Sequence, residues 1–93
     1  MALAAGKPEI VEDLKVFLED EVLREKTPDL GAETPLLELG ILNSLSTARV
    51  ISFIRERYGL FVPAEKIVGS NFRSLGQIAE LVIEMNADPH AHV

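Results

Sequence analysis

The 93-residue chain has no cysteine and no tryptophan, and aromatic residues make up only 5% of it. Without cysteine, the chain can form no disulfide, no thiolate metal site and no cysteine nucleophile. Its longest apolar runs extend over only a few residues, far short of the about 20 that cross a bilayer. The N-terminal segment is too short, and lacks the charged leader, for a secretory signal. We therefore expect a cytoplasmic protein without a membrane partner.

Histidine is scarce as well, since only His90 and His92 are present, both close to the C-terminus. Hydrolysis by a serine needs a base beside the hydroxyl, and no serine has one nearby in the sequence. A chain this short also leaves little room for a deep active site assembled from distant loops. We therefore predict that the protein is not an enzyme, with no catalytic residue and no metal ligand.

Acidic residues outnumber basic ones by 15 to 9, which gives a formal net charge of −6 at pH 7. Phosphate backbones repel such a chain, and this argues against nucleic acid as a partner. An acidic surface favours attraction to basic partner proteins, although the same charge also keeps a small protein soluble. The composition does not distinguish a surface that attracts basic partners from one that only keeps the protein soluble.

The hydrophobic periodicity predicts three longer helices and one short helix. The first helix is expected over residues 8–26, because Pro8 suits a first turn and an apolar stripe follows. That stripe consists of Ile10, Leu14, Phe17 and Leu18, with Val11 and Val22 beside it. In the long loop that follows, Thr34 and Pro35 predict a single helical turn over 35–39. Apolar side chains are expected to hold this loop on the core: Leu36, Leu37, Leu39, Ile41 and Leu42.

The second helix is predicted over residues 44–58, with Asn43 as its N-cap and Gly59 just past its end. Its core-facing stripe is formed by Val50, Ile54 and Tyr58, and its other side carries Leu45, Ala48, Arg49 and Ser52. A short third helix is expected over 63–68. The last helix is expected over 74–85, opened by a capping box of Ser74 and Gln77.

These elements predict an all-α fold, a small four-helix bundle with a long loop between its first two helices. The length fits one domain over 1–93. Its core is expected over about 8–86, with flexible tails at 1–7 and 87–93. We expect a monomer.

One stretch contains a candidate functional residue, Ser44. It covers residues 36–45, Leu-Leu-Glu-Leu-Gly-Ile-Leu-Asn-Ser-Leu. Ser44 follows an apolar loop that contains a glycine, and it opens the second helix. Its hydroxyl is therefore predicted at an exposed helix N-terminus, where free N–H groups and the helix dipole favour an anion such as a phosphate ester. A serine at this position most often has no function, so position alone only permits a modification.

The same stretch resembles the phosphopantetheine attachment signature of acyl and peptidyl carrier proteins, in which a glycine lies four residues before the modified serine. Gly40 and Ser44 keep that spacing. The resemblance extends from about Val11 to Val82, through Arg-x-x-Tyr-Gly, a Val-Pro connector and Asn-Phe-x-Ser-Leu-x-x-Ile-Ala. Phe72, Leu75 and Ile78 match positions that the family fills with apolar residues closing the bundle.

The resemblance implies that Ser44 carries 4′-phosphopantetheine, derived from coenzyme A, as a phosphodiester. The thiol of that arm would hold an acyl or aminoacyl group as a thioester, and the chain would act as its carrier. Partner docking is assigned to Leu45, Ala48, Arg49, Ser52 and Asn43. The implied partners are a phosphopantetheinyl transferase, an acyl- or aminoacyl-loading enzyme, and ketosynthase, condensation or tailoring enzymes.

Two departures from the family pattern narrow this role. Asn43 replaces the usual aspartate, which keeps the helix cap and loses a charge that can help hold magnesium or engage the transferase. The second helix presents Arg49, Arg55 and Arg57 instead of the acidic face of fatty-acid-synthesis carriers, and it would repel the partners of those carriers. We therefore favour a discrete type II acyl carrier of polyketide or nonribosomal peptide biosynthesis, the chemistry of many antibiotics. An aminoacyl (peptidyl) carrier and an unmodified interaction module with the carrier fold are the alternatives.

Overall fold

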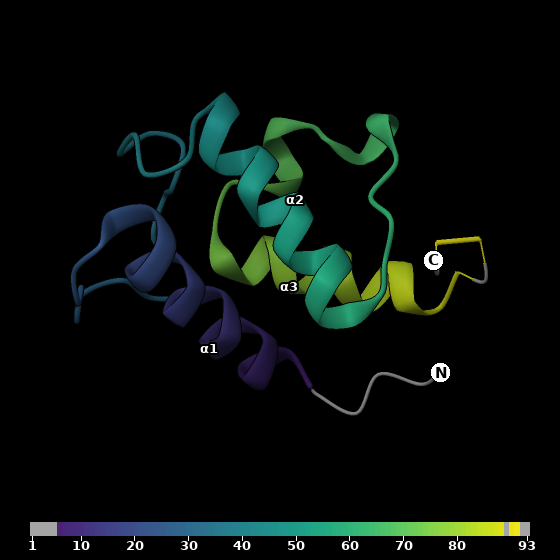
Figure 1. The fold of residues 1–93 in the computed structure, drawn as a ribbon, viewed down its shortest axis with the longest axis horizontal. Coiled ribbons are helices and arrows are strands. Elements are labelled where there is room, and N and C mark those ends of the chain that lie inside the picture. Colours follow the sequence, from purple (N-terminus) through teal and green to yellow (C-terminus); the bar gives the residue numbers. More distant parts are fainter. Residues whose placement is uncertain (1–5, 89, 92–93) are drawn as a thin grey trace.

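The structure of the protein is a computed structural model that describes residues 6–88, 90 and 91. In chain order, this part contains α1 (Lys7–Phe17), the π-helical η1 (Leu18–Leu23), α2 (Ser44–Tyr58), the 3-10 turns η2 (Ala64–Lys66) and η3 (Gly69–Asn71), and α3 (Leu75–Asn86). Figure 1 shows the helices gathered around one interior, with the long loop after η1 leading to the start of α2. The predicted all-α class is confirmed.

The first helical stretch is shorter than predicted. It becomes π-helical in η1 and ends at Leu23, so the predicted end at residue 26 is wrong by three residues. Arg24 adopts the left-handed conformation, with φ 60°, and this conformation stops the helix. The carboxylate of Glu19 accepts a hydrogen bond from the N–H of Thr27 at 2.7 Å, which turns the chain back toward the helix. Hydrophobic periodicity predicts neither the left-handed conformation of Arg24 nor the hydrogen bond from Thr27 to Glu19.

The apolar stripes predicted from the sequence meet in the interior. The buried side chains include Ile10, Leu14 and Leu18 from the first stretch, Val50 and Ile54 from α2, and Leu75, Ile78, Leu81, Val82 and Met85 from α3. The helix α1 packs closely on α3. By contrast, α1 and α2 meet through long side chains, with the rings of Phe17 and Phe53 stacked at 4.6 Å between centroids.

Fewer side chains than predicted hold the long loop on the core. Leu36 and Leu42 are buried, but Leu37 and Leu39 are exposed, so the prediction is wrong for these two residues. Backbone bonds hold this stretch instead, because the N–H groups of Ile41 and Leu42 both donate to the carbonyl of Leu36.

The single turn predicted over 35–39 is confirmed. The N–H of Leu39 donates to the carbonyl of Pro35 at 3.1 Å. Thr34 does not cap this turn, since its hydroxyl accepts a hydrogen bond from the N–H of Gly31 at 2.8 Å. The threonine therefore stabilises the preceding bend of the loop.

The short third helix predicted over 63–68 is confirmed only in part, because the structure has the single 3-10 turn η2 within this range. The second turn, η3, follows after Val68, which has an extended conformation. In η2, the N–H of Lys66 donates to the carbonyl of Pro63 at 2.9 Å, a bond between residues three apart. Such 3-10 geometry is typical of short connecting pieces. The described part of the chain thus has three longer helical stretches and two 3-10 turns, and a fourth α-helix is not among them.

The C-terminal tail folds back on the connector after α2. Ala91 is buried, and its carbonyl accepts a hydrogen bond from the N–H of Phe61 at 2.6 Å. Most of the predicted N-terminal tail, together with residues 89, 92 and 93, lies outside the described residues, so the flexibility of both tails stays a prediction. None of the described helices combines the length and the apolar character that a membrane span requires.

A polar cluster joins α1 to the end of α2. The hydroxyl of Tyr58 donates to Asp13 at 2.9 Å, and the guanidinium of Arg57 lies 3.4 Å from the same carboxylate oxygen. Burial, and then the hydrogen bond to Asp13, raise the pKa of Tyr58 well above its usual range. The folded state therefore holds the phenolic proton more tightly than the unfolded state does.

This pKa shift predicts a loss of stability in alkali. Because the folded pKa is the higher one, the contribution of Tyr58 is fully present below about pH 10 and is lost as the pH rises further. Tyr58→Phe should make the alkaline decline shallower, by on the order of 1 kcal/mol because the side chain is only partly buried. Chemical unfolding at a series of pH values measures this. Equal slopes in the two proteins above pH 10 would contradict the account.

Candidate functional site

Ser44 is the first residue of α2, and its side chain is exposed. Gly40, with φ 74°, supplies the left-handed conformation that bends the loop toward the helix start. Within the part of the chain that the structure describes, the Ser44 hydroxyl takes part in no hydrogen bond. This oxygen is therefore free to react without breaking any interaction of the fold.

A capping box fixes the start of α2. The side-chain oxygen of Asn43 accepts hydrogen bonds from the N–H groups of Leu45 and Ser46, each at 3.0 Å. In return, the hydroxyl of Ser46 accepts from the N–H of Asn43 at 2.8 Å. The predicted N-cap is thus confirmed, and asparagine fills the role without a charge.

This reciprocal box was not predicted, because the usual signature has Glu or Gln at the fourth position. The box predicted at Ser74 forms only in half: the hydroxyl of Ser74 accepts from the N–H of Gln77 at 3.2 Å. Gln77 is exposed. The sequence did contain a signal for this box, since Asn43 and Ser46 are short polar residues three positions apart.

An open, mostly apolar groove of about 500 Å³ begins at Ser44 and runs between α2 and the chain around η3. Its lining consists of Leu37, Asn43, Ser44, Thr47, Ala48, Ile51, Ile67, Val68, Gly69 and Phe72. A Cβ at Gly69 would lie 3.6 Å from the Leu37 side chain, so the loop and η3 approach each other here. The exposure of Leu37 thus has a structural reason, because this leucine lines the groove.

Polar bonds hold the outer side of this groove in place. The ammonium of Lys66 lies 2.9 Å from the carboxylate of Glu84 in α3. That hydrogen bond raises the pKa of Lys66. The side chain of Asn71 donates to the carbonyl of Lys66 at 2.8 Å, which ties η3 to η2.

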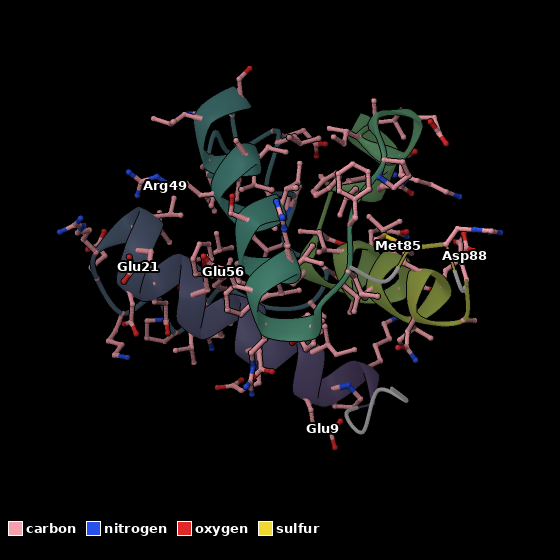
Figure 2. All side chains as sticks on the ribbon, turned by 45° about the vertical axis from the view of Figure 1, so that its right-hand side comes forward. Glu9, Glu21, Arg49, Glu56, Met85 and Asp88 are labelled. Carbon is pink, nitrogen blue, oxygen red and sulfur yellow. The ribbon has the colours of Figure 1, made fainter. Side chains whose placement is uncertain are left out.

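The predicted docking residues on α2 follow the cap Asn43, and all four are exposed: Leu45, Ala48, Arg49 and Ser52. Ala48 also lines the groove at Ser44. The guanidinium of Arg49 donates to the carbonyl of Glu21 at 3.0 Å and so reaches across to η1. Figure 2 shows Arg49 and Glu21 on the same side of the molecule. The structure therefore gathers these residues on one surface beside Ser44.

The site as a whole fits a flexible group attached through a phosphate. It offers one free exposed hydroxyl, a helix N-terminus whose dipole favours a negative charge, and an apolar groove that starts at that hydroxyl. When bound, such an arm supplies a thiol that carries the cargo. A group attached at Ser44 would be held at the start of a firmly capped helix.

Comparisons with known proteins agree with this geometry. A family model described as "Phosphopantetheine attachment site" matches residues 20–82. A chain in a solved structure entitled "Crystal structure of FAD-dependent dehydrogenase" is similar with a TM-score of 0.70 and 35% sequence identity, over 74% of this chain and 97% of that chain. No curated protein matches. The protein belongs to the family of phosphopantetheine attachment domains, whose covalent cofactor is 4′-phosphopantetheine.

Proposed function

We propose that Ser44 bears the phosphopantetheine arm and that the protein carries an acyl group on it as a discrete carrier. The observation that supports this most strongly is the free, exposed hydroxyl of Ser44 at the start of α2, inside the region matched by the family model. Ser46, the next serine, is only 6% exposed and its hydroxyl is used in the capping box. The chemistry of each step then belongs to partner enzymes.

Two features support a setting in polyketide or nonribosomal peptide assembly. Asn43 caps α2 without the negative charge of an aspartate. The exposed side of α2 carries Arg49 and Arg55, and its acidic residue is Glu56 alone. Such a surface disfavours enzymes with basic docking patches and so separates this carrier from fatty-acid synthesis. Residues 1–93 serve in this proposal as one carrier domain, loaded and used by separate enzymes in the cytoplasm.

The similar solved structure suggests one of those enzymes. Its matched chain is shorter than this protein, because 74% of this chain covers 97% of that one. A chain of that length is the size of a carrier and too small for a fold built from two nucleotide-binding halves. We infer that the crystal pairs a carrier-like chain with a flavin enzyme, and that the cargo of the present protein undergoes oxidation by such an enzyme.

The proposed oxidation removes two hydrogens from the cargo and reduces the FAD of the dehydrogenase. A base of the dehydrogenase takes a proton from the carbon next to the thioester, and a hydride leaves the following carbon for oxidised FAD, so that a C=C bond forms. With loaded carrier and a purified FAD-dependent thioester dehydrogenase, the cargo should lose the mass of two hydrogens and the flavin absorbance should bleach. An aminoacyl cargo with hydrogens on both carbons would react in the same way. Unchanged cargo and flavin with every cargo tested would contradict this part of the proposal.

The attachment itself is tested by intact mass. Incubation with coenzyme A and a broad-specificity phosphopantetheinyl transferase should add the mass of one phosphopantetheinyl group to the full chain. No mass gain, with a second carrier modified in the same tube as a control, would favour the unmodified interaction module instead.

A further inference from the structure

The side chain of Asn43, next to Ser44, has two ends with different surroundings. Its oxygen Oδ1 accepts hydrogen bonds from the N–H groups of Leu45 and Ser46, each at 3.0 Å, and lies 3.3 Å from the hydroxyl of Ser46. These two N–H donors fix the orientation of the amide, because only the oxygen can accept them. The nitrogen Nδ2 makes no hydrogen bond in the described part of the chain. Asn43 is exposed, so this nitrogen keeps two unused N–H donors at the start of α2.

The backbone at the start of α2 has few donors left for a group on Ser44. The N–H groups of Leu45 and Ser46 donate to the Asn43 side chain, and the N–H of Thr47 donates to the Asn43 carbonyl at 2.8 Å. Of the backbone donors in this first turn, the N–H of Ser44 has no acceptor among the described residues. A phosphate on Ser44 therefore meets a helix N-terminus whose donors are mostly in use.

The groove that begins at Ser44 has no charged residue in its lining. Its polar lining residues are Asn43, Ser44 and Thr47, and the others are apolar residues and one glycine. Charged side chains near Asn43 line a separate depression that does not include Ser44: Glu21, Arg24 and Arg49. In this groove, a phosphate on Ser44 thus faces neutral hydrogen-bond donors and no lysine or arginine.

Given the attachment proposed above, on which this inference rests, we propose that the Nδ2 amide of Asn43 donates a hydrogen bond to the phosphate of the arm on Ser44. A hydrogen bond from a neutral donor to a charged acceptor is stronger than one between two neutral groups. The fold already holds the Asn43 side chain through its oxygen, so little side-chain freedom is lost when the nitrogen binds. Asn43 is therefore a positioning residue that orients the arm where it joins the chain.

An aspartate at this position would act differently on the arm. It can cap the helix with one carboxylate oxygen, but its second oxygen would bring a negative charge close to the phosphate. The two anionic groups would repel each other. Together they would also attract a divalent cation, because Mg²⁺ and Mn²⁺ prefer carboxylate and phosphate oxygens. Asn43 avoids the repulsion, and an arm that it holds needs no metal ion at this point.

Thermal unfolding of the full chain, with and without the arm, tests the proposal. The arm should raise the midpoint of the wild-type protein by about 2–5 °C, because the bond from Asn43 exists only in the folded protein. Asn43→Ser keeps a capping oxygen and removes the amide, so its gain should fall to about half or less. An equal gain in the wild type and in Asn43→Ser would overturn the proposal.

Asn43→Asp separates the amide from the cap by charge. Without the arm, this variant should be at least as stable as the wild type, because aspartate caps equally well and complements the helix dipole. With the arm, its midpoint gain should vanish or reverse. Mn²⁺ should then broaden the Ser44 amide signal of the modified variant and leave that signal of the modified wild type unchanged. A wild-type gain retained in full by Asn43→Asp would contradict the role of the amide.

Nuclear magnetic resonance observes the donor itself. In the ¹⁵N-labelled wild-type protein, the arm should shift the side-chain NH₂ signals of Asn43 and slow their exchange with water about threefold to tenfold. Thr47→Val is the matched control, since Thr47 is the other polar neighbour in the groove lining and valine keeps its shape. This variant should retain the midpoint gain and the Asn43 shifts. Loss of the gain in Thr47→Val, with its retention in Asn43→Ser, would assign the phosphate contact to Thr47 and overturn the proposal.

Intact mass, read on the same samples, separates this role from the proposed function. If the wild type gains no phosphopantetheinyl mass, the carrier role fails and the role of Asn43 fails with it. If the mass is gained and the midpoint gains of the wild type and Asn43→Ser are equal, only the role of Asn43 fails.

Discussion

Ser44→Ala is expected to abolish phosphopantetheine uptake while leaving the fold intact. The hydroxyl is the atom that would form the phosphodiester, and the fold makes no use of it in the described part of the chain. Alanine is also at least as favourable as serine within a helix. Intact mass after incubation with coenzyme A and the transferase should show no gain, and the thermal midpoint should stay within a few degrees of the wild-type value.

Ser46→Ala is the matched control for this substitution, since it removes a hydroxyl two residues further along the same helix. It breaks the bond to the N–H of Asn43 and should lower the free energy of unfolding by about 0.5–2 kcal/mol. Its uptake of phosphopantetheine should nevertheless be complete. A mass gain in Ser44→Ala, or its loss in Ser46→Ala under conditions where that variant is folded, would contradict the assignment.

Ile54→Ala is expected to lower the free energy of unfolding by about 2–5 kcal/mol. Ile54 is 0% exposed and lies on the core stripe of α2, so its removal loses the apolar transfer energy and leaves a cavity. A small domain has little stability to spare, and this variant should be largely unfolded at moderate denaturant concentrations. Urea unfolding followed by circular dichroism measures the change.

Ile83→Ala removes the same atoms from an exposed position and is the control for Ile54→Ala. Ile83 lies on α3 and is 40% exposed, so we expect a loss below about 1 kcal/mol. Similar losses in the two variants would mean that the apolar stripe of α2 does not face the core as described.

The sequence predicted most accurately the parts of the fold that depend on local signals. Both ends of α2 are confirmed, because Asn43 and Gly59 each have one dominant role at a helix end. The start of α3 is also confirmed, with Ser74 as its cap. Periodicity placed the buried residues of these helices correctly, since one face of each must be apolar.

The predictions failed where contacts between residues distant in the sequence determine the local structure. The length of the first helical stretch depends on the bond from Thr27 to Glu19, eight residues apart. Leu30 is buried in the loop although its sequence neighbours carry no periodic pattern. The chain between Pro63 and Asn71 forms 3-10 turns because it spans from one helix to the next and is closed by bonds between residues three apart.

The candidate site was predictable in part. The motif predicted Ser44 as the attachment residue, and the structure shows that Ser44, Leu45 and Arg49 are exposed, as the direction of α2 led us to expect. The groove at Ser44 was not predictable, because it is lined by segments distant in the sequence. Arg24 was not predictable either, because it ends the first helical stretch at a position that periodicity did not locate.

The most direct test of the central claim locates the arm on the modified protein by peptide fragmentation. Trypsin releases residues 27–49, a peptide that contains both Ser44 and Ser46. Fragment ions that separate these two serines should place the whole added mass on Ser44. Added mass on Ser46 or on any other residue would contradict the account, as would a complete absence of added mass.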